Sequence, residues 1–417
     1  MKTLPALIIT LCLPALTGCV GFEVRKQNAA LGALAEFEGM LSDGDLPIEN
    51  GRPLIVLLVR EDGAQPKVEF SQVMYRAGRY HFFANEGRYS VFAFADLNSN
   101  LRIDEGEPRV TYPRQLLLQE GKLRASIDLM LSTDTTTKPH FEWAPIHDEL
   151  VTIADDRFRE RMGRKGHWAP GEFRKEVPVD RLYLLEPYDP NKLPVLYVPG
   201  IGGTPDDMRA VMEGMDKSRY QPWLFWYASG MRMNLAAQSL KSLLDEYRVL
   251  HDFQNVVVVS QCVGGLVARD AVAQLQDRDH KFNVAALVTF STPWGGHGMA
   301  ESGTTISPMT VPIWYDMKEG SEFQKQTIAT AIPSVPHYMF FSYGQGSNVG
   351  DDGTVALNSE LDVTMQQRAT EVIGFGVDHM GIVTLPQPLQ HFQNVLGRVR
   401  ERVAAGQAGP AGASSSR

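Results

Sequence analysis

The chain has 417 residues, of which 43% are hydrophobic and 21% are charged, and its formal net charge at pH 7 is -9. This length exceeds one typical domain, so we expect two folded units with connecting segments. A modest acidic excess argues against a nucleic-acid partner, and beyond residue 19 no apolar run is long enough to span a bilayer.

The first residues have the pattern of an export signal, in which Lys2 precedes an apolar stretch from Leu4 to Leu16. The tetrapeptide Leu16-Thr17-Gly18-Cys19 resembles the lipobox of bacterial lipoproteins, whose cysteine is lipidated and becomes the first residue of the mature chain. The resemblance implies a signal peptide at 1–18 and a membrane anchor on Cys19. A plain secretory signal that is cleaved nearby is the alternative.

The three cysteines differ in their expected fates. Cys12 leaves with the signal and Cys19 is lipidated, so Cys262 is expected to be the single free thiol of the mature chain, with no internal disulfide. A lone thiol in an exported protein is open to oxidation and therefore needs an explanation. Val20 stands where an aspartate would retain a Gram-negative lipoprotein in the inner membrane, so the resemblance implies a cell-envelope location, at the outer membrane in a Gram-negative source.

The N-terminal part is expected to be a tether followed by a small β-domain. Residues 19–50 form the tether, with helical character around Ala29 to Met40. Short strand-like runs at turn-rich spacing then predict a β-sandwich over residues 51–132. The runs are Leu54–Val59, Val68–Tyr75, Tyr80–Ala84, Tyr89–Ala95 and Leu123–Leu129. Residues 133–180 are polar or charged and irregular, and we interpret them as a linker region.

One turn of this β-domain carries oxygen-bearing side chains at loop positions 1, 3, 5, 9 and 12, which are Asp96, Asn98, Asn100, Asp104 and Glu107. That spacing suits calcium coordination. Leucine occupies position 6, which is normally glycine, and the flanking segments are predicted strands instead of helices. A calcium site and a plain polar turn therefore both stay open.

From Pro194 onward, apolar strands alternate with amphipathic helices, which is the pattern of a doubly wound, mostly parallel α/β sheet. The predicted domain covers residues 181–403, and the Ala-Gly-Ser-rich tail 404–417 is expected to be disordered. The predicted strands are Val195–Val198, Trp223–Tyr227, Val256–Val259, Val284–Phe290, Tyr338–Phe341 and Val372–Val377.

The strand Val256–Val259 runs into Ser260-Gln261-Cys262-Val263-Gly264-Gly265 and then an apolar helix. A sharp strand-to-helix turn needs small residues two before and two after its apex, and Ser260 and Gly264 meet that need. Cys262 is then the apex, above a helix N-terminus whose partial positive charge favours a thiolate. A buried structural cysteine is the alternative.

This region resembles the α/β-hydrolase superfamily, close to bacterial lipases and esterases and more distantly to lecithin:cholesterol acyltransferase-like enzymes. Those families usually carry G-x-S-x-G at the turn, whereas here Ser260 replaces the first glycine and Cys262 replaces the serine. Polyhydroxyalkanoate synthases do carry G-x-C-x-G-G. Their substrates are cytosolic thioesters, however, which the lipobox argues against.

Three further segments match the resemblance. Val198-Pro199-Gly200-Ile201-Gly202-Gly203 corresponds to an H-G-x-G-G loop, with proline for histidine, and implies an oxyanion hole made by the Ile201 and Val263 amides. Asp378-His379-Met380-Gly381-Ile382 resembles the segment around the catalytic histidine. Gly350-Asp351-Asp352-Gly353-Thr354-Val355 resembles the G-D-G-T-V segment that holds the acid.

The resemblance thus implies a triad of Cys262, His379 and Asp352, with Asp351 open as the alternative acid. Such a triad would attack acyl esters, with lipid-like esters expected, and pass through an acyl-thioester without a cofactor in catalysis. Water as acceptor gives hydrolysis, and an alcohol or amine gives acyl transfer. The competing hypothesis is a catalytically silent hydrolase fold that binds a lipid or a protein partner at the cell envelope. Residues 297–332 fit either a cap over a lipid-binding cleft or a plain insertion.

Overall fold

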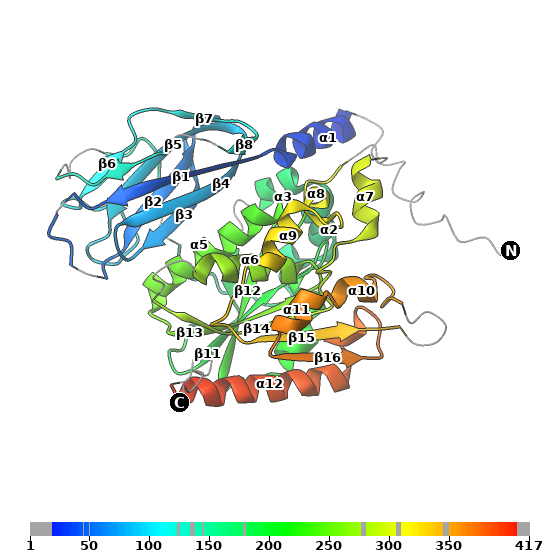
Figure 1. Ribbon diagram of the computed structural model, residues 1–417. Coiled ribbons are helices and arrows are strands. Elements are labelled where there is room, and N and C mark those ends of the chain that lie inside the picture. Colours follow the sequence, from blue (N-terminus) through cyan, green and yellow to red (C-terminus); the bar gives the residue numbers. More distant parts are fainter. Residues whose placement is uncertain are drawn as a thin grey trace, which may run out of the picture.

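The computed structural model describes residues 19–406, apart from 45, 50, 123–125, 134–137, 144–145, 178–180, 277–280, 306–309 and 345–349. Three β-sheets and the helices that pack on them make up the structure (Figure 1). The expected signal peptide, residues 1–18, and most of the C-terminal tail lie outside the described residues. Within the described part, no helix is both long and apolar enough to cross a bilayer.

The first described elements are α1 (Cys19–Gly32) and β1 (Leu34–Ser42). The helical character expected around Ala29–Met40 is therefore wrong from Leu34 onward. Ala35, Phe37 and Leu41 are each 1% exposed and belong to the core, while Glu36, between the first two, and every second residue from Glu38 onward are more exposed. This alternation has the period of a strand, so pairing with a neighbouring strand overrides the local helical tendency.

Residues 34–130 form two sheets. One has the order β4-β1-β8 with β9 also paired to β1, and the other has the order β3-β2-β5-β6 with β7 also paired to β5. The strands are β2 (Leu54–Arg60), β3 (Lys67–Met74), β4 (Gly78–Asn85), β5 (Gly87–Ala95), β6 (Arg109–Thr111), β7 (Leu116–Leu118), β8 (Gly121–Lys122) and β9 (Leu129–Met130). Phe82 of the first sheet and Val56 and Val91 of the second share one hydrophobic cluster, so the sheets have a common core. Four predicted strands overlap β2 to β5, and the fifth, Leu123–Leu129, begins in residues that are not described.

The third sheet has seven strands in the order β10-β12-β11-β13-β14-β15-β16, and only the β10–β12 pair is antiparallel. The strands are β10 (Arg181–Leu184), β11 (Leu193–Val198), β12 (Tyr220–Trp226), β13 (Asn255–Gln261), β14 (Asn283–Phe290), β15 (His337–Ser342) and β16 (Glu371–Phe375). Each of the six predicted strands overlaps one of the parallel strands. β10 was not predicted, because four residues are too few to show a pattern.

Helices cover both faces of this sheet (Figure 1). The helices in this part of the chain are α2 (Glu160–Trp168), α3 (Pro170–Glu176), α4 (Arg209–Glu213), α5 (Met233–His251), α6 (Gly264–Gln276), α7 (Gly298–Thr305), α8 (Ile313–Met317), α9 (Glu322–Ala329), α10 (Leu357–Glu360), α11 (Val363–Arg368) and α12 (Pro386–Ala404). Alternate residues of β13 face opposite ways: Val259 shares a cluster with Phe392 of α12, and Val258 shares one with Leu244 of α5 and Leu266 of α6. A strand buried on both faces is apolar throughout, which is why the sequence shows it so clearly.

The region 133–180, which was interpreted as an irregular linker, contains α2 and α3. The buried face of α2 consists of Met162, Gly163 and Gly166, so two of its three positions are glycine and no apolar stripe reveals the helix. A Cβ at Gly163 would come within 2.4 Å of the Gly202 carbonyl oxygen. α2 therefore lies directly on the glycine-rich loop that follows β11.

The turn between β5 and β6 satisfies its polar groups internally. Asp96 and Glu107, at its two ends, accept hydrogen bonds from backbone N–H groups of the turn at 2.8–3.0 Å. The side-chain amides of Asn98 and Asn100 donate to Asp104 at 2.9 and 2.7 Å. Among the described residues, no three His, Cys, Asp or Glu side chains are grouped so that they could hold a metal ion. Calcium binding here stays a prediction.

Candidate active site

Cys262 stands in a two-residue turn between β13, which ends at Gln261, and α6, which begins at Gly264. Its φ is 54°, in the left-handed region that costs energy for any residue other than glycine, and its N–H donates to the Phe290 carbonyl at 2.8 Å. Strain of this kind persists where the surrounding structure enforces it, and it occurs most often at functional positions.

Two glycines bring the loop after β11 against this turn. A Cβ at Gly264 would lie 2.5 Å from the Pro199 carbonyl oxygen, and a Cβ at Gly200 would lie 2.8 Å from the Cys262 Cβ. No larger residue fits at either position without a shift of backbone or of the cysteine. The glycine pattern noted in the sequence thus has a structural cause, namely the close approach of the two loops beside the sulfur.

Within the described residues, the backbone N–H groups of Ile201 and Val263 have no hydrogen-bond partner. Their neighbours are held in place: the Gly202 N–H donates to the Ser229 hydroxyl at 3.0 Å, and the Gly203 N–H donates to the Gly200 carbonyl at 3.2 Å. The two amides named from the sequence therefore lie on fixed loops and keep their hydrogens available to a ligand oxygen.

The structure brings His379 and Asp352 together. The ring nitrogen His379 Nδ1 lies 2.6 Å from Asp352 Oδ2. The backbone N–H of His379 also donates to the backbone carbonyl of Asp352 at 3.0 Å. The other oxygen, Asp352 Oδ1, accepts the N–H groups of Thr354 and Val355 at 2.9 and 2.7 Å. Asp351 instead accepts the Gly353 N–H at 2.9 Å. The geometry therefore selects Asp352 as the carboxylate that orients the imidazole.

Burial and partner charges act in opposite directions on this pair. Burial alone would raise the pKa of Asp352, but the hydrogen bond and positive charge of His379 hold that pKa at about 2. Burial alone would lower the pKa of His379, but the negative charge and hydrogen bond of Cys262, together with those of Asp352, raise it to about 10. The site thus favours the charged forms of both the imidazole and the carboxyl group.

A second carboxyl group lies behind the acid. The Ser342 hydroxyl donates to Asp352 Oδ2 at 2.7 Å, and the Ser342 N–H donates to Glu360 Oε2 at 3.1 Å. Glu360 is 1% exposed, and its carboxyl group forms a side-chain hydrogen bond with Asp352. Burial and then the charge of Asp352 raise the pKa of Glu360 to about 9, so this carboxyl group is neutral at pH 7. Sequence reasoning missed both Ser342 and Glu360, because no motif contains them.

Gln261 was also missed, although it immediately precedes the cysteine. Its side-chain Nε2 lies 3.0 Å from His379 Nε2, the nitrogen that faces away from Asp352. A neutral imidazole can accept a hydrogen bond from this amide, and the amide turned by 180° would present its oxygen to an imidazolium. Gln261 can therefore support both protonation states of the histidine.

His167, at the C-terminal end of α2, is a third residue that the sequence did not indicate. Its Nδ1 would lie 3.7 Å from a Cβ placed on Gly202, so the ring adjoins the glycine-rich loop. Its Nε2 is buried and has no partner among the described residues, and burial lowers the pKa of His167 to about 4. A neutral imidazole with one unused nitrogen therefore stands beside the expected oxyanion hole. No signal in the sequence indicated the helix that carries it, because Gly163 and Gly166 occupy most of its buried face.

Two further polar residues lie near this group but do not belong to it. His297 contacts the Thr354 carbonyl at 2.9 Å through its Nε2, so it touches the loop that carries Asp352 but does not reach the triad. Asp378, next to His379, accepts the Gly381 N–H at 2.6 Å and so shapes the turn.

Cys19 is the first residue of α1, and its lipidation stays a prediction.

No protein-family model and no curated protein matches the sequence. Three solved structures illustrate the similarity that exists. The mature lipase BlEst2 of Bacillus licheniformis is 20% identical, with a TM-score of 0.41, and the match covers 52% of this chain and 98% of that one. Est1E from Butyrivibrio proteoclasticus is 12% identical, with a TM-score of 0.38 and coverage of 53% and 93%. The monoacylglycerol lipase of Paleococcus ferrophilus is 11% identical, with a TM-score of 0.40 and coverage of 54% and 99%.

Proposed function

We propose that residues 181–403 form an α/β-hydrolase domain that cleaves or transfers acyl groups through a triad of Cys262, His379 and Asp352. The observation that carries the proposal is the imidazole of His379. Its Nδ1 lies 2.6 Å from Asp352 Oδ2, and the negative charge and hydrogen bond of Cys262 raise the pKa of the imidazole. A nucleophile, a base and an orienting acid joined in this way are the requirement for covalent acyl catalysis.

In the first half-reaction, His379 already holds the proton that the Cys262 thiol has given up, and the thiolate sulfur attacks the acyl carbonyl carbon. The carbonyl oxygen becomes an oxyanion that accepts the N–H groups of Ile201 and Val263. Loss of one such donor costs enzymes about 3 kcal/mol in the barrier. The C–O bond of the ester then breaks, His379 returns the proton to the leaving alcohol, and an acyl-thioester remains on Cys262.

In the second half-reaction, His379 takes a proton from the acceptor, which attacks the thioester carbonyl and releases the Cys262 sulfur. Water as acceptor gives a carboxylic acid, whereas an alcohol or amine gives a new ester or amide. A thioester favours transfer to such acceptors, because the sulfur is a better leaving group than the oxygen of a serine ester. Hydrolase and acyltransferase are thus two outcomes of the same covalent intermediate.

Aromatic side chains beside the glycine-rich loop support a lipid-like acyl group as substrate. Trp168 follows His167 at the end of α2 and is 41% exposed. Its ring packs edge to face against the ring of Trp314 on α8, with the two ring centroids 5.5 Å apart. Partly exposed aromatic rings next to an oxyanion loop offer an apolar surface to an acyl chain.

We further propose that a lipid on Cys19 anchors the chain in the bacterial cell envelope, at the outer membrane if the source is Gram-negative. The support is the lipobox-like tetrapeptide that ends at Cys19. Expression with an alkyne-bearing fatty acid tests the anchor: label is expected on the wild type and lost in Cys19→Ala. Equal labelling of both proteins would contradict the anchor and leave the triad unaffected.

The triad is tested by intact mass. The detergent-solubilised full chain is incubated with p-nitrophenyl esters of increasing chain length, quenched with acid and weighed, and the modified peptide is mapped. We expect a mass gain of one acyl group on Cys262, absent in Cys262→Ala. Cys19→Ala is the matched control, since it removes a different cysteine and should retain the adduct.

The Cys262→Ser variant separates the two outcomes of the thioester. Faster hydrolysis by this variant, with slower transfer to added alcohols or amines, would identify the wild type as a transferase. Absence of both adduct and turnover with every ester would overturn the covalent mechanism and favour a hydrolase fold that only binds its lipid or protein partner.

A further inference from the structure

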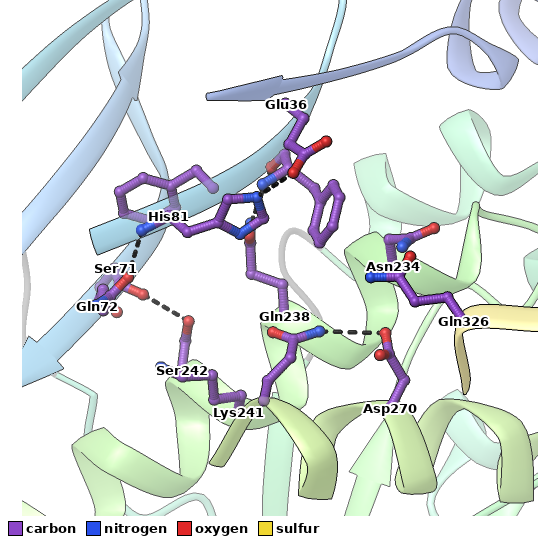
Figure 2. A pocket seen from close by; sticks show the side chains of 13 residues that line it. Glu36, Ser71, Gln72, His81, Asn234, Gln238, Lys241, Ser242, Asp270 and Gln326 are labelled. Carbon is purple, nitrogen blue, oxygen red and sulfur yellow. Dashed lines mark hydrogen bonds and ion pairs between the residues drawn. The ribbon is translucent and has the colours of Figure 1, made fainter. Parts of the chain in front are cut away.

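A cavity of about 250 Å³ lies apart from the triad, between β1, β3 and β4 on one side and α5, α6 and α9 on the other (Figure 2). Its volume is several times the roughly 30 Å³ that one water molecule occupies in the liquid. It is also close to the lower end, roughly 300 Å³, of pockets that bind small molecules. The two halves of the wall come from chain segments separated by more than a hundred residues, so the cavity exists only in the folded protein.

Side-chain amides with unused hydrogen-bonding capacity line this cavity. Gln72, on β3, is 2% exposed; its Oε1 accepts the His81 N–H at 3.2 Å, but its Nε2 has no partner among the described residues. Asn234 of α5 and Gln326 of α9 also line the cavity, and neither side chain makes a hydrogen bond within the part of the chain that the structure describes. Figure 2 shows these two amides across the cavity from the strands. A buried amide without a partner is uncommon in folded proteins and calls for a ligand or water.

The charged groups around the cavity are mostly compensated within the protein. Lys241 lies 2.9 Å from Asp245, and His81 lies 2.9 Å from Glu36. Asp270 of α6 is the remaining carboxyl group of the wall, and it accepts a hydrogen bond from Gln274 Nε2 at 3.1 Å. Burial raises the pKa of Asp270 to about 7. The wall therefore offers amide donors, amide acceptors and one carboxyl group, without an uncompensated cation that would attract an anion.

An apolar face completes the wall. Phe83 of β4 lines the cavity beside His81, and the two rings meet edge to face with centroids 4.6 Å apart. His81 and Glu36 are partly exposed, at 26% and 29%, so a ligand can reach the cavity beside these two residues. Paired amide and carboxyl groups next to an aromatic ring suit hydroxyl groups on a carbon ring or chain, because each hydroxyl both donates and accepts a hydrogen bond.

We propose that this cavity binds a small, uncharged polyhydroxylated molecule, of the size of a monosaccharide or a glycerol unit, through Gln72, Asn234, Gln326 and Asp270. The ligand would bridge the N-terminal β-sheets and helices α5, α6 and α9. An acyl chain does not fit this site, because it would leave the buried amides unsatisfied. The proposal does not depend on the chemistry at Cys262, which lies outside this wall.

The test measures binding of defined sugars to the full chain by titration calorimetry and saturation-transfer NMR, in a detergent without a sugar headgroup. The probes are glycerol, methyl β-D-glucopyranoside and N-acetylglucosamine, with octyl β-D-glucopyranoside below its micelle concentration as a model of a glycolipid headgroup. At least one probe is expected to bind saturably at millimolar concentration. Binding of the methyl glycoside identifies a free sugar as sufficient, and binding of the octyl glycoside alone identifies a glycolipid headgroup.

Asn234→Leu and Gln326→Leu remove amides that make no bond with described residues, so both variants should fold. Each is expected to weaken binding about tenfold, the loss that follows from one unpaired hydrogen bond. Gln387→Leu, an exposed glutamine on α12, is the matched control and should bind as the wild type does. Two results would overturn the proposal: no saturable binding of any sugar, or binding that both cavity variants retain. Saturable binding of ethanolamine or acetate without any sugar would also overturn it.

Discussion

The turn from Asp96 to Glu107 and the turn around Cys262 both gather polar groups at the end of a strand, but they differ in whether those groups are satisfied. In the first turn, the carboxylates accept backbone N–H groups and the asparagine amides bond to a neighbouring carboxylate. In the second, the Val263 N–H has no partner among the described residues, and neither does the Ile201 N–H of the glycine-rich loop that packs against this turn. A buried unpaired polar group costs about 1–3 kcal/mol, so it persists where a ligand completes it. Unpaired N–H groups therefore distinguish the proposed catalytic turn from the other turn better than the number of polar residues does.

The largest expected effect separates the two aspartates of the acid loop. Asp352→Asn is expected to lower kcat/KM for p-nitrophenyl esters about 10⁴-fold, because the asparagine favours the wrong tautomer of His379, as in serine proteases. Asp351→Asn, the adjacent matched control, should retain activity within a few-fold. An equal loss in the two variants would mean that the loop is needed only for its fold.

The next effect concerns the buried carboxyl group behind the acid. The folded pKa of Glu360 is about 9 against an ordinary 4.5, so the folded state holds a proton that the unfolded chain releases as pH rises. Stability from this group is therefore lost progressively between pH 4.5 and 9. We expect Glu360→Gln to raise the Tm by several degrees at pH 8 and to change it little at pH 4.

Exposed Glu322 provides the control for that measurement, because its ion pair with Lys325 is exposed and contributes little, so Glu322→Gln should change the Tm little at either pH value. A Glu360→Gln protein that is destabilised at pH 8 would show that Glu360 is ionised there and stabilises the loop as an anion. That result would contradict the conclusion that the Glu360 carboxyl group is neutral at pH 7.

A smaller effect is expected at the unpaired nitrogen beside the glycine-rich loop. His167→Phe preserves a ring against Trp168 but removes the nitrogen, so we expect kcat/KM to fall about tenfold, the value of one hydrogen bond to the substrate, while the Tm stays within a few degrees. His140→Phe replaces an exposed histidine that contacts Glu61 and serves as the control. Unchanged kinetics in His167→Phe would mean that Nε2 stays unpaired during turnover.

The smallest effect is expected at the satisfied turn. Because Asp96 and Glu107 already accept backbone hydrogen bonds, a calcium ion would have to replace those partners, and we expect millimolar calcium or a chelator to shift the Tm by less than a few degrees. A large calcium-dependent rise in Tm, abolished by Asp96→Asn, would instead establish calcium at this turn. It would also show that a turn whose polar groups are hydrogen-bonded within the protein can still bind a ligand.

The six parallel strands of the large sheet could be predicted because strands buried on both faces are continuous apolar runs. The elbow could be predicted because small residues must flank its apex. The helix α2 could not, since its buried face is built from Gly163 and Gly166, which carry no hydrophobic signal. β1 could not be distinguished from a helix in the sequence, because its residues become alternately buried and exposed only when the strand pairs with β4.

For the candidate site, short motifs were enough to name Cys262, His379 and Asp352, because each follows the end of a strand in a parallel sheet and such ends meet at one edge. Their partners were not visible in the sequence. The choice between Asp351 and Asp352 depends on which carboxylate reaches a histidine 27 residues away, and the contact of Gln261 with His379 spans 118 residues. Local burial patterns determine elements and their order. Contacts between distant segments depend on how loops and helices pack, which is why the choice of Asp352 over Asp351, the unpaired groups beside the sulfur and the polar cavity emerged only from the folded chain.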